Sequence, residues 1–159
     1  MEHRIRPATL GDIDTLVQQR RRMWEDMGER DAGKLAAHDA TYRAWAADLF
    51  QQGRYAAWLA EDAQGNVVAG GCVWLREWQP LPGAKDGLEA YLLSMYTAPE
   101  ARGQGCAKRI VAEALAWTQA KGYPRLRLHA SEMGRPLYAK LGFERTWEMR
   151  IDLAEAAKC

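Results

Sequence analysis

Ala101-Arg102-Gly103-Gln104-Gly105-Cys106-Ala107-Lys108 is the stretch that most constrains the fold, because it joins an apolar, strand-like run to an amphipathic helix through a turn of small residues. Glycines at 103 and 105 permit backbone conformations that other residues disfavour, and they let a ligand approach the main chain closely. The first turn of the following helix leaves backbone N–H groups unpaired and carries the positive end of the helix dipole. These features predict a binding site for a phosphate or pyrophosphate.

The flanking residues argue against two common phosphate-binding motifs. No P-loop string of Gly-Lys-Ser/Thr follows either glycine, and the dinucleotide fingerprint requires a third small residue where Lys108 stands. The pattern Arg102-x-x-Gly105-x-Ala107, placed after the run Glu89 to Tyr96, instead resembles the coenzyme A loop of the GNAT superfamily of N-acetyltransferases. A helix start with a flexible turn is the alternative that the glycines alone leave open.

Periodicity along the rest of the chain predicts both helices and strands. Apolar residues at helical spacing indicate helices, and alternating or short continuous apolar runs indicate strands. The predicted helices cover residues 9–27, 35–52, 106–121 and 133–141, and the predicted strands cover residues 4–7, 55–61, 67–78, 89–96, 124–130 and 143–153. Strands 55–61 and 67–78 form a predicted hairpin, and a crossover helix sets strand 124–130 parallel to strand 89–96.

This order of elements predicts an α+β fold, with a mixed, mostly antiparallel sheet, a central βαβ crossover and flanking helices, and it resembles the GNAT fold. The chain has 159 residues, the size of one domain. We therefore expect residues 1–159 to form a single acetyltransferase domain with its motif region at residues 89–143. In the resembling family, the first two helices are usually the variable, substrate-side part.

Charge and cysteine content limit the expected partners. The formal net charge of +1 provides no overall field that would attract nucleic acid or an anionic membrane. The three cysteines lack metal-binding spacing and cannot all pair with one another, which argues against a secreted disulfide scaffold. The sequence contains no signal-peptide core and no run of about 18 apolar residues. We expect a cytoplasmic protein without a metal, a nucleic-acid partner or a membrane partner.

The resemblance implies acetyl-CoA as the cosubstrate. In the resembling family, the strand before the loop carries a bulge and splays away from the next parallel strand, which leaves a slot for the pantetheine arm. On this chain, backbone groups near Met95 and Thr97 would bind the pantetheine, and N–H groups of residues 103–108 would bind the pyrophosphate. The residues assigned to the coenzyme in this way are Met95, Tyr96, Thr97, Arg102, Gly103, Gln104, Gly105, Cys106, Ala107, Lys108, Ser131 and Arg135.

A second segment, Gly134-Arg135-Pro136-Leu137-Tyr138-Ala139-Lys140-Leu141-Gly142-Phe143, is similar to the family's Ala-x-x-x-Tyr-x-x-x-Gly-Phe motif. Tyr138 falls on the motif tyrosine, and a phenol with a pKa near 10 can protonate the coenzyme thiolate as it leaves. Packing of this ring between helix and sheet is the alternative. Two positions depart from the pattern: Ser131 stands where the family often has asparagine, and Gly134 replaces the usual alanine.

The sequence marks no residue clearly as the base that accepts the proton of the attacking amine. Glu89 is the leading candidate, because period-two alternation places it on the same face as Tyr91 and Met95 and because the family sometimes uses an early-strand glutamate. A solvent-facing strand start is the alternative. His129 and Glu132 lie near the same slot in the sequence, although structural roles are more typical of such residues.

Cys106 offers a different mechanism, since a thiol at a helix N-terminus can form an acyl-enzyme. The corresponding family position is usually aliphatic and points inward, so a core role and direct attack by the amine are favoured. The predicted function is acetyl transfer from acetyl-CoA to a primary amine of a small molecule or peptide, with a homodimer left open. An acyl-CoA sensor without turnover is the main alternative. A toxin-like enzyme acting on aminoacyl-tRNA is disfavoured by the near-neutral charge.

Overall fold

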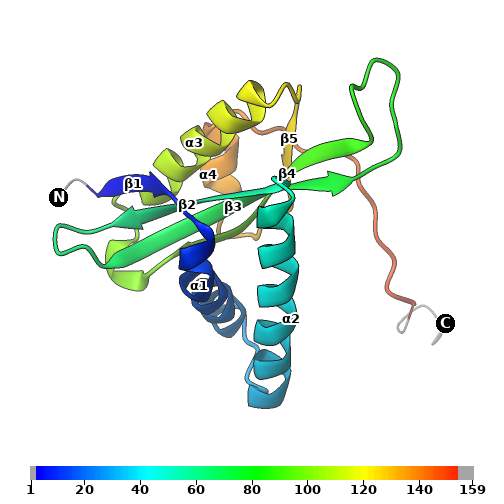
Figure 1. Cartoon of the computed structure of the whole chain (residues 1–159). Helices are drawn as coiled ribbons and strands as arrows, with labels where there is room; N and C mark the ends of the chain where they lie inside the picture. The colour runs from blue at the N-terminus through cyan, green and yellow to red at the C-terminus, as the bar shows by residue number, and fades with distance from the viewer. Residues whose placement is uncertain (1–2, 154–159) are drawn as a thin grey trace. The chain divides into compact units, whose positions relative to one another are not determined.

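The computed structural model describes residues 3–153 and divides the chain into two compact units, Met1–His129 and Ala130–Cys159. Figure 1 shows the elements along the chain. The first unit contains β1 (Arg4–Pro7), a 3-10 turn (Leu10–Asp12), α1 (Ile13–Asp26), α2 (Ala32–Gln51), β2 (Tyr55–Glu61), β3 (Val67–Glu77), β4 (Leu88–Thr97), a 3-10 turn (Pro99–Ala101), α3 (Cys106–Ala120) and β5 (Leu126–Leu128). The second unit contains α4 (Arg135–Lys140).

The five strands form one sheet in the order β1-β2-β3-β4-β5. The first three pairings are antiparallel, and β4 and β5 are parallel. The hairpin of β2 and β3 and the crossover from β4 through α3 to β5 confirm the predicted topology. The predicted fold class, α+β with a mixed and mostly antiparallel sheet, is therefore confirmed.

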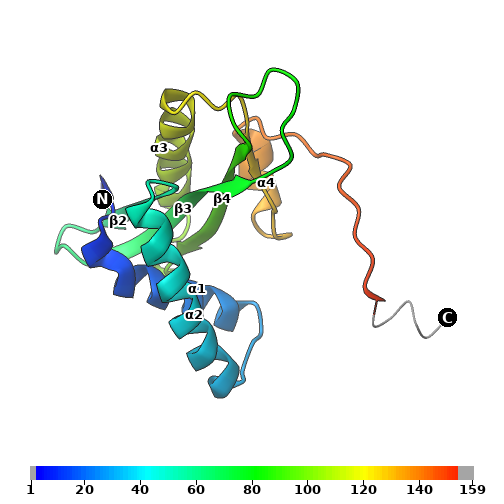
Figure 2. The same ribbon diagram turned by 45° about the vertical axis from the view of Figure 1, so that its right-hand side comes forward.

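Two neighbouring glycines of β3 show how the helices cover the sheet. A side chain at Gly70 would meet Gln19 of α1, whereas a side chain at Gly71 would meet Ile110 of α3. Successive positions of a strand point to opposite faces, so α1 and α3 lie on opposite faces of the sheet. Figure 2 shows α1 and α2 together on one side and α3 on the other.

Each face of the sheet carries its own apolar core. On the α1 and α2 side, the buried residues that pack together include Leu16, Val17, Tyr42, Ala46, Leu49, Tyr55, Leu59 and Cys72. On the α3 side, Ile110, Val111 and Ala114 are fully buried, as the predicted helical stripe requires. The two cores hold β3 and β4 between them and fix the strands that carry the candidate site.

A β-bulge interrupts the pairing of β3 with β4. The register shifts between Gly70 and Cys72, so that Gly71 faces two residues of β4, Ser94 and Met95. Ser94 has a φ of 54° and is the one non-glycine residue with a positive φ among residues 3–153. This backbone conformation is unfavourable for a residue with a side chain, and it must be held by its surroundings.

The parallel pairing of β4 with β5 is short. It joins Ala90, Tyr91 and Leu92 to Leu126, Arg127 and Leu128, and it ends there. Within the described part of the chain, no strand pairs with residues 93–97 of β4 on the β5 side. The bulge and the end of the pairing thus coincide, and they leave main-chain groups of β4 available to a ligand.

The predicted boundaries hold for most elements, and local chemistry explains the shifts. The predicted helix 35–52 starts earlier, at Ala32, because the carboxylate of Asp31 accepts a hydrogen bond from the Lys34 N–H at 2.9 Å. The predicted helix 9–27 begins with a 3-10 turn before α1. The predicted strand 124–130 is shortened to Leu126–Leu128; Pro124 has no N–H to contribute to a ladder.

The predicted last strand, residues 143–153, is wrong, since residues 143–152 adopt no regular secondary structure. The alternation that suggested it is real, with Trp147, Met149 and Ile151 separated by polar residues. A strand also requires a neighbour for its backbone hydrogen bonds, and no described strand pairs with this segment. None of the helices within residues 3–153 is both long and apolar enough to cross a membrane.

Candidate active site

The turn before α3 contains two glycines in the left-handed region. Gly103 has a φ of 76°, and Gly105, the N-cap of α3, has a φ of 82°. A side chain at either position would meet nothing within 4 Å, so the space beside both glycines is open. Within the described chain, the N–H groups of residues 103–108 donate to no other residue, and the first bonded N–H is that of Arg109, at 3.1 Å from the Gly105 carbonyl. Clustered free donors at a helix N-terminus form an anion site.

The side chains of this turn bind the protein itself. Arg102 forms an ion pair with Asp26 at the end of α1, at 2.6 Å, and its Nε donates to the Thr97 carbonyl at 3.0 Å. The amide of Gln104 donates to the Glu100 carbonyl at 2.8 Å. Arg102 and Gln104 thus hold the turn in place, while the main chain is left to contact a ligand.

Cys106 is buried at the first position of α3, as a core residue would be. Burial raises the pKa of its thiol, which lowers the fraction of reactive thiolate. This environment argues against the acyl-enzyme alternative. Ala107 is half-buried and Lys108 is exposed in the same turn.

The end of β4 supplies the second part of the site. Tyr96 is buried opposite Gly70, and Thr97 lies opposite Ala69. The thioether of Met95 occupies the place where a side chain at Gly71 would be, so Gly71 is required for this packing. The backbone of these residues has no strand partner on the β5 side within the described chain, as the predicted pantetheine slot requires.

Arg20 of α1 holds the bulge from the opposite face of the sheet. Its Nη1 donates to Ser94 Oγ at 2.7 Å, its Nε donates to His38 Nε2 at 3.1 Å, and its guanidinium carbon lies 4.7 Å from the centre of the Tyr42 ring. Burial, with the nearby charge of Arg20, lowers the pKa of His38, so the neutral imidazole can accept this hydrogen bond. No local pattern in the sequence predicts this contact between Arg20 and β4.

Glu89, the predicted proton acceptor, lies between two arginines. Its Oε1 accepts from Arg76 Nε at 2.5 Å, and its Oε2 lies 3.2 Å from Arg127 Nε. The guanidinium of Arg76 also lies 4.0 Å from the centre of the Tyr91 ring. Glu89 would have to weaken these ion pairs to take up a proton, although Oε2 contacts only Arg127 within the described chain and so has a lone pair for a water.

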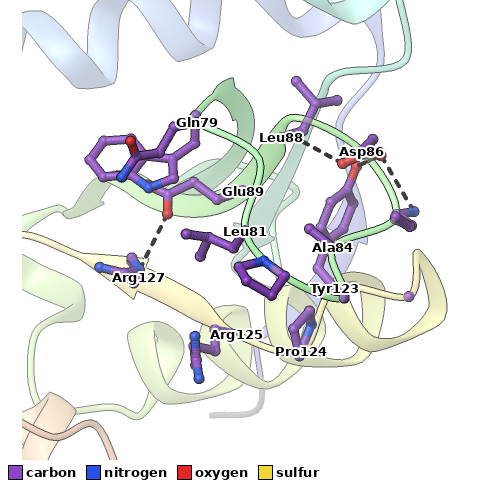
Figure 3. A pocket seen from close by; sticks show the side chains of 15 residues that line it. Gln79, Leu81, Ala84, Asp86, Leu88, Glu89, Tyr123, Pro124, Arg125 and Arg127 are labelled. Atoms are coloured by element: carbon purple, nitrogen blue, oxygen red, sulfur yellow. Dashed lines mark hydrogen bonds and ion pairs between the residues drawn. The ribbon is translucent and has the colours of Figure 1, made fainter.

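A cavity of about 380 Å³ lies beside Glu89. Figure 3 shows that the loop between β3 and β4, with Leu81 and Ala84, forms one side, and that the chain from Tyr123 to Arg127 forms the other. Arg125 and Arg127 alternate with leucines in the sequence, a pattern that places both arginines on the same face of a strand. Their proximity to Glu89 depends on the β4 and β5 register, which the sequence does not reveal.

The second unit contains the remaining predicted residues. Burial raises the pKa of Tyr138, whose ring packs edge-on against Phe143 at 5.7 Å between centres, and its hydroxyl bonds to no described residue. Ser131 Oγ accepts a hydrogen bond from the Gly134 N–H at 3.1 Å, and Arg135 is exposed. A Cβ at Gly134 would lie 3.0 Å from the Tyr138 ring, so an alanine at this position would require the ring to shift by a few tenths of an ångström.

The first unit thus brings together the predicted coenzyme residues of β4 and of the turn before α3. Glu89 lies on the same strand, four residues before Leu93, a span of about 13 Å at about 3.3 Å per residue. The alternative bases His129 and Glu132 are both exposed. Within residues 3–153, no group of three or more His, Cys, Asp or Glu side chains is arranged to hold a metal ion.

Comparisons with known proteins agree with this arrangement. Residues 53–145 match the family model described as Acetyltransferase (GNAT) domain. The chain is 31% identical over 108 residues to aminoglycoside N(6')-acetyltransferase type 1 of Serratia marcescens, an alignment that covers 66% of this chain and 73% of that protein.

Two solved structures show the same fold over nearly their whole length. A GCN5-related N-acetyltransferase from Ralstonia eutropha JMP134 superposes with a TM-score of 0.84 and 32% identity, covering 96% of this chain and 99% of that one. A protein from Clostridium acetobutylicum, described as a predicted acetyltransferase with acetyl-CoA, has a TM-score of 0.85 and 26% identity, with 97% and 98% covered.

Proposed function

The chain belongs to the GNAT acetyltransferase family and is an acetyl-CoA-dependent N-acetyltransferase, and from this premise we propose that it acetylates the primary amine of a small molecule by direct attack in a ternary complex. One observation carries the proposal: the free N–H groups before α3 lie at the end of the same strand whose pairing stops at Leu92. A diphosphate and an extended thiol-bearing arm need these two features side by side.

The residues present fit acetyl-CoA. The N–H groups of residues 103–108 would hold the diphosphate, and main-chain groups of Met95 and Thr97 would bind the pantetheine. The coenzyme supplies an activated thioester. The chain's own contribution is to orient that thioester beside the bulge at Ser94, which Arg20 holds in position.

The proposed reaction forms an amide and releases a thiol. The amine nitrogen attacks the thioester carbonyl, the carbon–sulfur bond breaks, and the phenol of Tyr138 gives its proton to the leaving thiolate. The nitrogen loses a proton through water to Glu89, whose Oε2 keeps a lone pair free. Tyr138 is in its protonated form at neutral pH, because the pKa of a tyrosine is ordinarily near 10 and burial raises it further.

A small-molecule acceptor is supported by the relatedness to the Serratia marcescens enzyme, whose name identifies an aminoglycoside as its acceptor. The described carboxylates of α1 and α2 do not form the free acidic surface that several ammonium groups would require. Asp14, Glu25, Asp26 and Asp39 are each paired with an arginine. Asp48 accepts a hydrogen bond from the Gln52 amide and is the one described carboxylate of these helices without an arginine partner. We therefore propose small primary amines as the class of acceptor and do not restrict the proposal to aminoglycosides.

We also propose that the protein forms a homodimer. The C-terminal segment exposes four large apolar side chains, with exposed fractions of 94% for Trp147, 93% for Met149, 70% for Ile151 and 75% for Leu153. A second copy of the chain could cover this alternating face with one of its own strands. Sedimentation velocity across a range of protein concentrations tests this: Trp147→Glu should shift the protein toward monomers, and a wild-type protein that is monomeric throughout would exclude the dimer.

The proposed function is tested by incubation with acetyl-CoA and a panel of primary amines, with thiol release and acetylated product measured together. We expect thiol release that depends on the amine. Calorimetric binding of coenzyme without turnover on any amine would favour the sensor alternative, and the absence of coenzyme binding would exclude the proposed site.

A further inference from the structure

The cavity beside Glu89 is lined by one more cation than carboxylates, and Lys85 and Arg127 are ion-paired with Asp86 and Glu89. Lys85, Arg125 and Arg127 line it together with the acidic residues Asp86 and Glu89. Both acidic side chains already have partners, because Glu89 binds Arg76 and Arg127, and Asp86 accepts from the Tyr123 hydroxyl at 2.9 Å. A ligand that enters this cavity therefore meets carboxylates that already have hydrogen-bond or ion-pair partners.

Arg125 is the cation that remains available. It is exposed on the cavity wall, and it forms no hydrogen bond or ion pair with any residue of the described chain. Arg127, two positions further along, pairs with Glu89, so the register of β5 places Arg125 on the same side of the sheet as Glu89. Figure 3 shows Arg125 and Arg127 on the same wall of the cavity.

The opposite wall is a fixed loop. Asp86 also accepts a hydrogen bond from the Leu88 N–H at 3.0 Å, and Lys85 Nζ donates to the Lys121 carbonyl while lying 4.1 Å from the centre of the Tyr123 ring. These contacts fasten the loop between β3 and β4 to the end of α3. The cavity is thus preformed, with apolar side chains such as Leu81 facing the arginines.

We propose that this cavity holds the acceptor, and that the acceptor carries an anionic oxygen group, a carboxylate or a phosphate, which Arg125 binds. The inference rests on the proposed acetyl transfer and narrows its substrate class to amines with an acidic group. Guanidinium binds such groups with two parallel hydrogen bonds. An acceptor with several ammonium groups would instead be repelled by the unpaired arginine.

The geometry also predicts a spacing between the two groups of the acceptor. Arg125 lies three residues before Leu128, where the pairing of β4 with β5 ends, and this corresponds to about 10 Å at about 3.3 Å per residue. The amine must reach that end of the pairing while the anionic group stays near Arg125. An acceptor with a spacer is therefore expected to react faster than one whose amine adjoins its acidic group.

Steady-state kinetics with a graded series of amines tests the inference. The series contains ω-amino carboxylates, aminoalkyl phosphates, alkylamines and α,ω-diamines of matched length. We expect one of the two anionic series to exceed the alkylamines by about five- to ten-fold in kcat/KM, mainly through KM. Equal values for alkylamines, or higher values for diamines, would overturn the inference while leaving acetyl transfer in place.

Arg125→Gln should remove that preference, so that anionic amines and alkylamines of matched length give similar kcat/KM. Arg22→Gln is the matched control, because Arg22 is also exposed, on α1, and does not line the cavity. A preference that survives in Arg125→Gln, or that Arg22→Gln also abolishes, would contradict the role of Arg125.

A binding measurement tests the cavity even where no amine is turned over. Backbone NMR resonances of Lys85, Tyr123 and Arg125 should shift on titration with an ω-amino carboxylate or an aminoalkyl phosphate, and the shifts should be lost in Arg125→Gln. Unchanged resonances with both probes would overturn the inference. Failure of the proposed function itself would instead appear as the absence of thiol release with every amine.

Discussion

Arg20 and Ser94 lie 74 residues apart in the sequence, yet Arg20 Nη1 donates to Ser94 Oγ at 2.7 Å. The bond joins α1 to the bulge of β4, where Ser94 adopts a φ of 54°. Helix α1 therefore supports the strand that is proposed to hold the coenzyme.

Substitutions at Ser94 should separate the effect of its positive φ on stability from the effect of its hydrogen bond with Arg20 on coenzyme binding. Ser94→Val should lower the free energy of unfolding by about 1–2 kcal/mol or more, because a β-branched residue is strained at positive φ. Ser94→Gly accepts this φ and should be near-neutral in stability, while it loses the bond to Arg20 and weakens coenzyme binding. Urea denaturation and calorimetry measure the two effects. Equal stability for the two variants would contradict the strained bulge.

Gly105→Asp should weaken acetyl-CoA binding by at least about ten-fold, because a carboxylate would stand where the helix N-terminus attracts a phosphate. Gly65 provides the matched control. It has a φ of 84° against 82° for Gly105, and a side chain at either position meets nothing within 4 Å. Gly65→Asp should carry the same backbone cost without the binding loss. Similar affinities in the two variants would count against the loop as the diphosphate site.

Tyr138→Phe should lower kcat by about 100-fold, the lower range of general acid catalysis, with little change in coenzyme affinity. The ring would still pack against Phe143, so the thermal midpoint should not change. Because burial raises the pKa of Tyr138, activity should persist to higher pH than an ordinary phenol would allow. A kcat equal to that of the wild type would remove Tyr138 from the mechanism.

Glu89→Gln should lower kcat by about 100-fold with little change in coenzyme affinity, as expected for loss of a general base. Arg127→Gln is the companion variant, since it removes the ion pair at 3.2 Å and leaves the carboxylate. If the two variants lower stability and kcat by the same amounts, Glu89 serves only to hold the arginines.

His38 should make the protein less stable in acid. Burial lowers its pKa below the ordinary value of 6.5, so the unfolded chain binds the proton more readily than the folded chain. The free energy of unfolding should therefore keep its highest value above pH 6.5, and it should decrease as the pH falls below 6.5. His38→Gln, which keeps an acceptor for Arg20, should flatten this dependence. A wild type and a variant with parallel stability curves between pH 7 and 5 would refute the assignment.

Local patterns were sufficient to predict most of the fold. The glycines before α3, the helical stripe at Ile110, Val111 and Ala114, and the proline-rich loop before β4 each act over a few residues. The fold class followed from such patterns, the family followed from the resemblance of two short motifs to the GNAT superfamily, and both are confirmed. The strand predicted at residues 143–153 failed because alternation describes which side chains share a face, whereas a strand exists only where a neighbour pairs with it.

The candidate site was predictable only in part. The backbone donors at residues 103–108 follow from local sequence, whereas the neighbours of Glu89 follow from how β3, β4 and β5 are aligned. Arg20 meets Ser94 because two helices fold over one face of the sheet, and no local pattern contains that information. The roles assigned to Glu89 and Tyr138 stay predictions.

The paired glycines of β3 make the chain unusually intolerant at two positions that no substrate needs to touch. The side chain of Gln19 occupies the position that a Cβ at Gly70 would take, and the side chains of Met95 and Ile110 pack where a Cβ at Gly71 would lie. A Cβ at residue 70 would meet the flexible end of the Gln19 side chain, whereas a Cβ at residue 71 would also meet the branched side chain of Ile110, which has less freedom to move. In a saturation mutagenesis survey scored by survival of coenzyme binding, residues 70 and 71 should stand out as sharply as the loop itself, and homologues that diverge freely in their acceptors should still be confined there.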